Sequence, residues 1–254
     1  MIRNNWNHDE LIVAFNLYCK TPFSKIGLNN SGIQVLAKTI HRSVSAVALK
    51  LTNFARLDPF LQNRGLSGMS NGSKGEVKVW DEFNGNWDEL AFESERILAK
   101  YKNKSIEKSA DIYTKDLLPE GKEREAIIKR RVNQSFFRNS VLASYNNKCC
   151  ITGISIPELL VAGHIIPWSI NLQQRTNPAN GLCLNALHDK AFDKGLMTIN
   201  SDYTIRFSKN LLNKTKKDYD MHFHPYEGKS ISLPQKFYPQ KEFLEFHNSN
   251  VFVK

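Results

Sequence analysis

Five side chains in the second half of the chain have residue types and spacings that suit acid–base chemistry beside a bound cation. His164 lies sixteen residues before Asn180, Asp189 follows nine residues later, and Asp193 lies four residues beyond Asp189. An imidazole exchanges its proton close to neutral pH, and carboxylate oxygens are the ligands that hard cations prefer. His188, next to Asp189, adds a second imidazole. These residues are useful together only if the fold brings them to one place.

The sequence between them predicts two strands followed by a helix. Residues 159–166 form an apolar run that includes His164, and Pro167 ends it. Asn180-Gly181 is a turn signal, after which residues 182–184 predict a short return strand. From Asn185 the apolar spacing becomes helical, and the two aspartates, four residues apart, share one helical face. Strand, loop, strand and helix should therefore bring His164, Asn180 and the two carboxylates together.

This order and spacing resembles the HNH, or ββα-metal, endonucleases. The likeness extends over roughly residues 128–252 through the runs FFRNSVLASYNNKCCITG, HIIPW, NGLCL, HDKAFDKG and LPQKFYPQKEFLEFH, which look like those of bacterial HNH enzymes of restriction and defence. The resemblance implies that His164 is the general base that activates water and that Asn180 fixes the hairpin and so aims the imidazole. It also implies that Asp189 and Asp193 hold one divalent cation. Phosphodiester hydrolysis leaving 5′-phosphate and 3′-hydroxyl ends would follow.

Two features depart from the family pattern. Many HNH nucleases carry a metal ligand immediately before the histidine, where this chain has Gly163. Others hold a structural zinc with Cys-x-x-Cys pairs, but Cys150 is followed three positions later by Gly153, and Cys183 by Ala186. We therefore predict no structural zinc. With two carboxylates and water as ligands, Mg²⁺ is the expected cation and Mn²⁺ the alternative.

His188 lies next to the first of the two aspartates in the sequence. Helical geometry turns its side chain about 100° from the face of the two aspartates. We expect it to support the site beside the ligands, with direct binding to the cation as the alternative.

The first half of the chain predicts three short helices. The apolar spacing indicates helices near residues 11–18 and 31–40, and Ser43 could cap a third helix that buries Val44, Val47, Leu51 and Phe54. A tight turn before a basic last helix is typical of helix-turn-helix or Myb-like units, whereas a plain helical bundle with solvated cations is the alternative. The side chains expected to contact DNA are Arg42, Lys50, Asn53 and Arg56, with Arg175 as a candidate phosphate contact in the second half.

Composition and charge favour a soluble protein with a polyanionic partner. Thirty-five Lys and Arg against 25 Asp and Glu give a net charge of +10. Residues 11–80 hold nine basic and two acidic side chains, and residues 81–95 hold six acidic and no basic ones. No apolar run is long enough to cross a membrane. The four cysteines are too irregularly spaced for a disulfide framework, and reduced thiols indicate a cytoplasmic location.

These patterns predict an α+β protein of two domains. Residues 1–100 would form a mainly helical DNA-recognition domain, residues 101–122 a linker, and residues 123–254 the ββα-metal nuclease domain, with a helix at about 123–145. Double-stranded DNA is the expected partner, and a homodimer could present paired sites to its two antiparallel strands. The competing functions are a DNA-binding regulator whose ββα unit is an inactive scaffold, and an RNA-directed or toxin-like nuclease.

Overall fold

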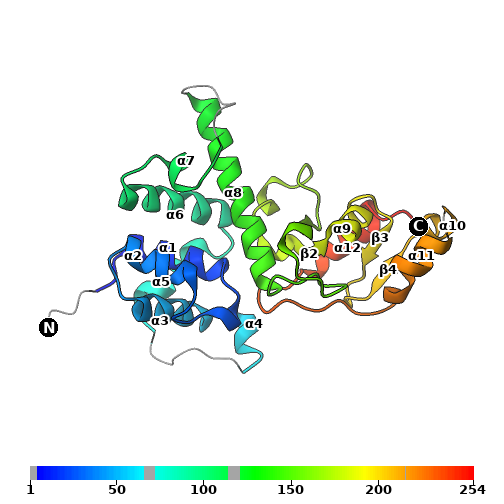
Figure 1. Ribbon diagram of the computed structural model, residues 1–254, viewed down its shortest axis with the longest axis horizontal. Helices are drawn as coiled ribbons and strands as arrows, with labels where there is room; N and C mark the ends of the chain where they lie inside the picture. The colour runs from blue at the N-terminus through cyan, green and yellow to red at the C-terminus, as the bar shows by residue number, and fades with distance from the viewer. Residues whose placement is uncertain (1–4, 66–71, 114–120, 215) are drawn as a thin grey trace. The chain divides into compact units, whose positions relative to one another are not determined.

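The chain folds into two compact units, residues 1–140 and 141–254. The structure is a computed structural model that describes residues 5–65, 72–113, 121–214 and 216–254, with no side-chain description for 212–214. Figure 1 shows helices in the first unit, and both helices and short strands in the second. Each unit is described by itself below.

The first unit is helical and is built around helix α1. Its helices are α1 (His8–Cys19), α2 (Ser31–Thr39), α3 (Val44–Ala55), α4 (Pro59–Gln62), α5 (Lys74–Phe83), α6 (Trp87–Lys102), α7 (Ile106–Ser109) and most of α8 (Lys122–Ser144). Helix α1 packs against α3, α5 and α6. Its Phe15 and Tyr18 are fully buried, and Phe15 stacks on Phe54 at a centroid distance of 4.9 Å. Large aromatic side chains thus supply much of this core.

The helix starts in this unit follow the sequence signals. Ser43 accepts a hydrogen bond from the Ala46 amide at the start of α3, as its position predicts. The turn between α2 and α3 is tight, and His41 in it adopts a positive φ of 56°. The Gly/Ser/Asn-rich segment predicted as a loop over residues 63–75 is only partly described, because 66–71 lie outside the described residues. Helix α5 already begins at Lys74.

The unit boundary differs from the predicted linker. Residues 101–122 contain helix α7, which packs against α6, so the described part of this segment belongs to the first unit. The boundary instead falls after Ser140, inside α8. Polar composition predicted a linker there, but Arg124 and Glu107 form an ion pair at 2.7 Å that ties α8 to this segment.

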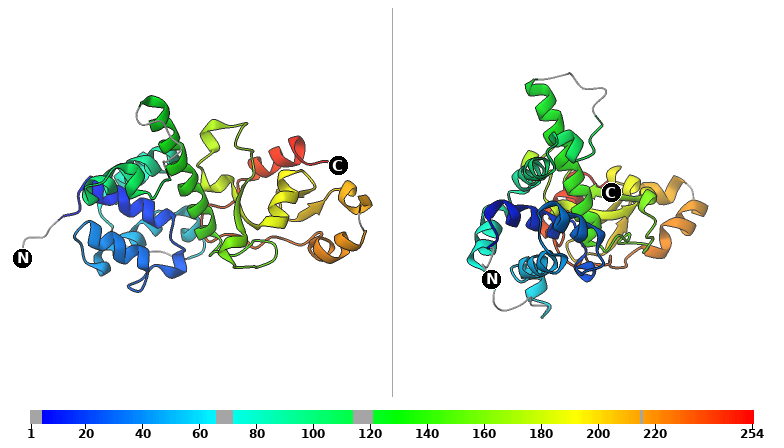
Figure 2. Two further views of the ribbon diagram at one scale, coloured as in Figure 1. Left: turned by 45° about the horizontal axis from the view of Figure 1, so that its top comes forward. Right: turned by 60° about the vertical axis from the view of Figure 1, so that its left-hand side comes forward.

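The second unit contains two antiparallel hairpins. Strand β1 (Leu160–His164) pairs with β2 (Gly181–Asn185), and β3 (Met197–Ile199) pairs with β4 (Ile205–Phe207). Helix α9 (Ala186–Asp193) follows β2 directly and packs on β1, β2 and β3, while α12 (Lys241–Asn250) packs on β3 (Figure 2). Short helices α10 (Lys209–Lys214) and α11 (Lys216–His222) complete the unit.

The β1–β2–α9 unit has a tightly packed apolar interior. Leu182, Cys183 and Leu184 are fully buried in β2, and Cys149 and Cys150 are buried beside the hairpin, where the Cys150 amide donates to the Cys183 carbonyl at 2.8 Å. Leu187 is 48% exposed, because it lies on the outer face of the first turn of α9. Among the described residues, no helix combines the length and hydropathy needed to span a bilayer.

Candidate functional site

Asn180 ties together the segments that meet at the end of the β1–β2 hairpin. Its Oδ1 accepts from the Ile166 amide at 2.8 Å, and its Nδ2 donates to the carbonyls of Ile166 and Gln174 at 3.2 and 3.1 Å. The Asn180 side chain is buried, and its amide therefore has little freedom to rotate. These bonds hold the loop after β1 against the start of β2.

His164 lies at the end of β1, opposite Gly181. Its Nε2 is 2.9 Å from the carbonyl of Arg175, and because a carbonyl only accepts, Nε2 donates and the neutral ring carries its lone pair on Nδ1. The ring also contacts Trp168 edge-on at 5.5 Å. Burial lowers the pKa of His164 below its ordinary value of 6.5, which favours the neutral imidazole that a general base requires.

Asp189 and Asp193 lie one turn apart on α9, as predicted. Burial, followed by the negative charge of Asp193, raises the pKa of Asp189 from 3.8 to about 6. Asp193 is exposed, and its carboxylate lies 3.9 Å from Lys190 Nζ. A partly buried carboxylate beside a second one is electrostatically unfavourable unless a proton or a cation compensates it.

Gly163 faces Asp189 across the contact between β1 and α9. A Cβ built on this glycine would lie 2.6 Å from Asp189 Oδ1 and 3.4 Å from a methyl group of Leu184. The absence of a side chain therefore makes room for the carboxylate. This explains in steric terms why glycine can stand where many HNH proteins have a ligand.

The two carboxylates fit a hard cation that keeps much of its water. Among the residues that the structure describes, no group of three or more His, Cys, Asp or Glu side chains could hold a metal ion. Mg²⁺ is commonly bound by one or two carboxylates together with water and phosphate oxygens, so a pair suffices for it. A zinc site of the usual four protein ligands would need more donors.

His188 faces the interior, on a different side of α9 from the aspartates. Its Nδ1 lies 3.1 Å from Asn185 Oδ1, which also accepts from the His188 amide at 3.0 Å. Its ring packs edge-on against Phe223 and Tyr226 at centroid distances of 5.5 and 5.4 Å. Burial lowers its pKa to about 4. The predicted turn of about 100° from the carboxylate face agrees with this placement.

Three further residues around the site were not assigned these roles from the sequence. The Arg175 carbonyl holds His164, while the Arg175 guanidinium lies over the Trp168 ring at 4.9 Å and its Nε donates to the Trp168 carbonyl at 2.7 Å. His247 of α12 stacks on Phe192 at 3.7 Å and bonds to the Phe192 carbonyl at 3.2 Å. The Pro167-Trp168 pair, which closely follows His164 in the sequence, could have indicated a role for Trp168. The contact of the Arg175 carbonyl and the distant His247 leave no local pattern in the sequence.

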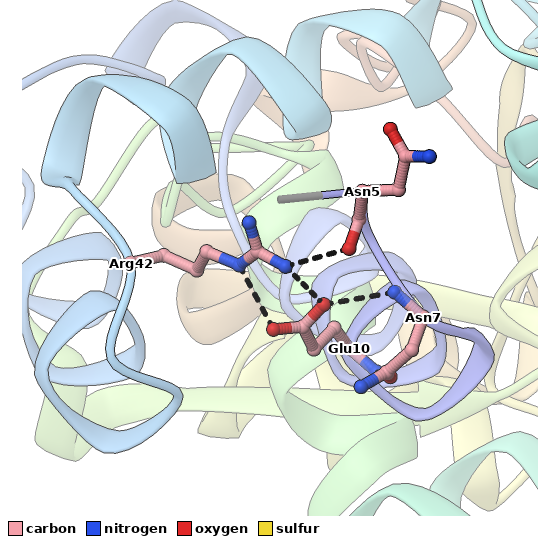
Figure 3. A network of polar contacts seen from close by, with 4 residues as sticks. All are labelled: Asn5, Asn7, Glu10 and Arg42. Atoms are coloured by element: carbon pink, nitrogen blue, oxygen red, sulfur yellow. Dashed lines mark hydrogen bonds and ion pairs between the residues drawn. The ribbon is translucent and has the colours of Figure 1, made fainter. Parts of the chain in front are cut away.

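The structure places Arg42 in an internal network. Its Nε and one terminal nitrogen contact the two carboxylate oxygens of Glu10 at 2.9 and 2.8 Å, and the same terminal nitrogen donates to the Asn5 carbonyl at 2.9 Å (Figure 3). Glu10 also accepts from the Asn7 amide at 2.9 Å. The Arg42 side chain is only 11% exposed. It ties the turn before α3 to the start of α1.

Lys50 and Asn53, which we expected to contact DNA, also point inward. Lys50 pairs with Glu76, and Asn53 donates to the same carboxylate at 3.0 Å. The cause is a contact between distant residues. Glu76 belongs to α5, and its carboxylate is fully buried, so Lys50 and Asn53 must turn inward to reach it. The Arg56 guanidinium lies against Gly72, where an added Cβ would clash with it.

Comparison with known proteins agrees with the geometry of the second unit. A family model described as HNH endonuclease matches residues 149–200, a span that includes both strands of the first hairpin and all of α9. No curated protein matches the chain. Residues 149–200 therefore form an HNH endonuclease domain by this match.

Proposed function

We propose that the protein is a metal-dependent DNA endonuclease in which His164 is the general base. The observation that carries this proposal is the state of His164: a half-buried imidazole with a lowered pKa, held through Nε2 by a carbonyl, at the end of the strand that packs on the Asp189 helix. A scaffold without catalytic function would not require a neutral, oriented histidine there. For this reason, a DNA-binding regulator whose ββα unit is an inactive scaffold is the weaker proposal.

In the proposed reaction, His164 removes a proton from the water that attacks phosphorus. With Nε2 donating to the Arg175 carbonyl, Nδ1 is the atom that accepts this proton. Asn180 keeps this arrangement in place, because its Nδ2 holds the carbonyl of Gln174, the residue next to Arg175. Asp189 and Asp193 would hold the cation, which supplies charge stabilisation for the phosphate and the leaving oxygen when bound.

The substrate and the cation follow from charge and donor chemistry. A net charge of +10 favours a polyanion, and duplex DNA is our proposed substrate. Mg²⁺ is the proposed cation, with Mn²⁺ as a substitute. A role in restriction or phage defence, in the cytoplasm, is proposed from the resemblance of the whole second half to such enzymes. His188 is proposed to support α9 from the interior.

The test is cleavage of plasmid DNA by His164→Ala, Asp189→Ala and the wild type with Mg²⁺. Removing a general base typically slows a reaction by about 10² to 10⁴, and Asp189→Ala should cost at least as much. His188→Ala is the control within α9 and should lose less activity than either. Thermal melting establishes that each variant is folded. Cleavage by His164→Ala at the wild-type rate under saturating Mg²⁺ would refute the assignment of His164 as the general base. A parallel assay on RNA decides whether DNA or RNA is the substrate.

A further inference from the structure

The loop after β1 places a guanidinium beside the proposed general base. The Arg175 side chain lies over the Trp168 ring at 4.9 Å, and its Nε donates to the Trp168 carbonyl at 2.7 Å. The same ring meets the His164 ring edge-on at a centroid distance of 5.5 Å. Trp168 therefore contacts both side chains and fixes the guanidinium with respect to the imidazole.

The terminal nitrogens of Arg175 have no hydrogen-bond partner within the part of the chain that the structure describes. None of the ion pairs formed by the described residues includes Arg175 either, whereas Arg42, Arg96 and Arg124 each pair with a glutamate. Arg175 is nevertheless half-buried, so part of its hydration is lost. A cation in this state is best compensated by an anion from outside the chain.

The charge of Arg175 acts directly on the imidazole. Burial is the largest cause of the lowered pKa of His164, and the positive charge of Arg175 lowers this pKa further, whereas the hydrogen bond to the Arg175 carbonyl raises it. A phosphate that is attacked by a water deprotonated at His164 must lie close to the His164 ring. Such a phosphate lies close to the Arg175 guanidinium as well.

We propose that Arg175 is a catalytic residue that binds the non-bridging oxygens of the phosphate under attack, and that Trp168 is the positioning residue that holds Arg175 beside His164. This role rests on the proposed function, and it is narrower than the general DNA phosphate contact expected of Arg175 from the sequence. The planar guanidinium presents parallel N–H donors that match two phosphate oxygens. Donors fixed in advance stabilise the charge of the transition state. The guanidinium stays protonated throughout, and the proton of the attacking water passes to His164.

Steady-state nicking of supercoiled plasmid with Mg²⁺ tests this role in the full-length protein. Arg175→Ala keeps the bond to His164, because the main-chain carbonyl makes it. The variant should lose about 10²- to 10³-fold in kcat, which is the usual cost of removing one transition-state donor. Its DNA affinity, measured by fluorescence anisotropy in EDTA, should fall by about tenfold or less, because only one phosphate contact is lost. Arg175→Lys restores the charge without the paired donors and should recover only part of kcat. Millimolar guanidinium should accelerate Arg175→Ala but not the wild type.

Arg206→Ala is the matched control. Arg206 also lies over an aromatic ring, that of Phe252, at 4.5 Å, but it belongs to β4. The Arg206→Ala variant should keep the wild-type kcat. Trp168→Leu should lower kcat, and Trp168→Phe, which retains a flat ring, should restore most of it.

Three results would overturn the proposal. A loss of DNA affinity at unchanged kcat in Arg175→Ala would assign Arg175 to a phosphate remote from the reaction. Wild-type kcat in Arg175→Ala, or an equal loss in Arg206→Ala, would remove the specific role of this guanidinium. Wild-type kcat in Trp168→Leu would remove the positioning role. If Arg175→Ala does not fold, Arg175→Lys decides, because full activity with lysine shows that paired donors are not required.

A binding measurement separates failure of this role from failure of the proposed function. The Arg175 Nε–H, which donates to the Trp168 carbonyl, gives an NMR signal that is identified by its absence from Arg175→Lys. In EDTA, the dinucleotide thymidylyl-thymidine, which carries one phosphate, should shift that signal, whereas thymidine, which carries none, should not. If the wild type cuts DNA and the signal does not shift, the proposed function stands and the role of Arg175 fails. If the wild type cuts nothing with Mg²⁺, the proposed function fails and takes the catalytic role with it, while a shift still identifies Arg175 as a phosphate-binding residue.

Discussion

Replacing Gly163 with Ala should abolish most activity while leaving the fold intact. The new Cβ would lie 2.6 Å from Asp189 Oδ1, whereas ordinary contacts begin at 3.4 Å, so the carboxylate must retreat by about 0.8 Å. The clashing atom is the end of a side chain that can rotate, and Gly163 lies in a strand that accepts alanine, so the stability cost should be small. A displacement of about 1 Å in a catalytic group costs about 10²-fold in rate, and we expect a loss of that order.

The assay is nicking of supercoiled plasmid under Mg²⁺, with thermal melting of the same samples. Gly27→Ala is the control, because a Cβ at Gly27 meets nothing within 4 Å. Its activity and melting temperature should equal those of the wild type. A folded Gly163→Ala protein that cuts as fast as the wild type would show that the position of Asp189 does not limit the reaction, and the proposed cation site would fail with it.

Three further outcomes follow from the titrating groups and the ligand set. Because burial lowers the pKa of His164, the neutral base persists below pH 6.5, and the rate should fall only as pH drops through that lower pKa; an acid limb at or above pH 6.5 contradicts this. Burial lowers the pKa of His247 to about 4, so between pH 6.5 and 4 the unfolded chain binds a proton that the folded chain excludes. Urea denaturation should therefore show stability falling from pH 7 to pH 4.5, and His247→Gln should fall less steeply. Finally, EDTA-treated protein should keep its circular dichroism spectrum and regain activity with Mg²⁺; tightly held zinc whose removal unfolds the protein would disprove the ligand assignment.

Local sequence signals predicted the elements that carry the candidate site. The apolar run that Pro167 ends predicted β1, and the Asn180-Gly181 signal marked the start of β2. Asn185 is the N-cap of α9, and its side chain accepts a hydrogen bond from the His188 amide. This local interaction starts the helix at the residue where the apolar spacing becomes helical. The long apolar stripe likewise predicted α8 to within a residue at each end. Apolar periodicity and helix capping involve residues only a few positions apart, so both can be recognised in the sequence alone.

The parts that sequence reading did not foresee depend on contacts between distant residues. Lys50 was expected to contact DNA, but a buried carboxylate 26 residues away, on Glu76, draws it inward. The packing of His188 depends on Phe223 and Tyr226, which lie in a later segment without a distinctive pattern. The β3–β4 hairpin was also missed, because three-residue strands are too short for a clear alternation.

The stacking of His247 on Phe192 has a consequence for the order in which the protein matures during synthesis. The two residues are 55 positions apart, so α9 is synthesised before α12 exists to cover it. Until then the helix that bears Asp189 and Asp193 lacks the ring beneath its last turn and the hydrogen bond to the Phe192 carbonyl. Shortened products that end before α12 would carry an incompletely supported carboxylate pair. Under the proposed function, only chains translated through residue 247 would therefore have a fully supported cleavage site.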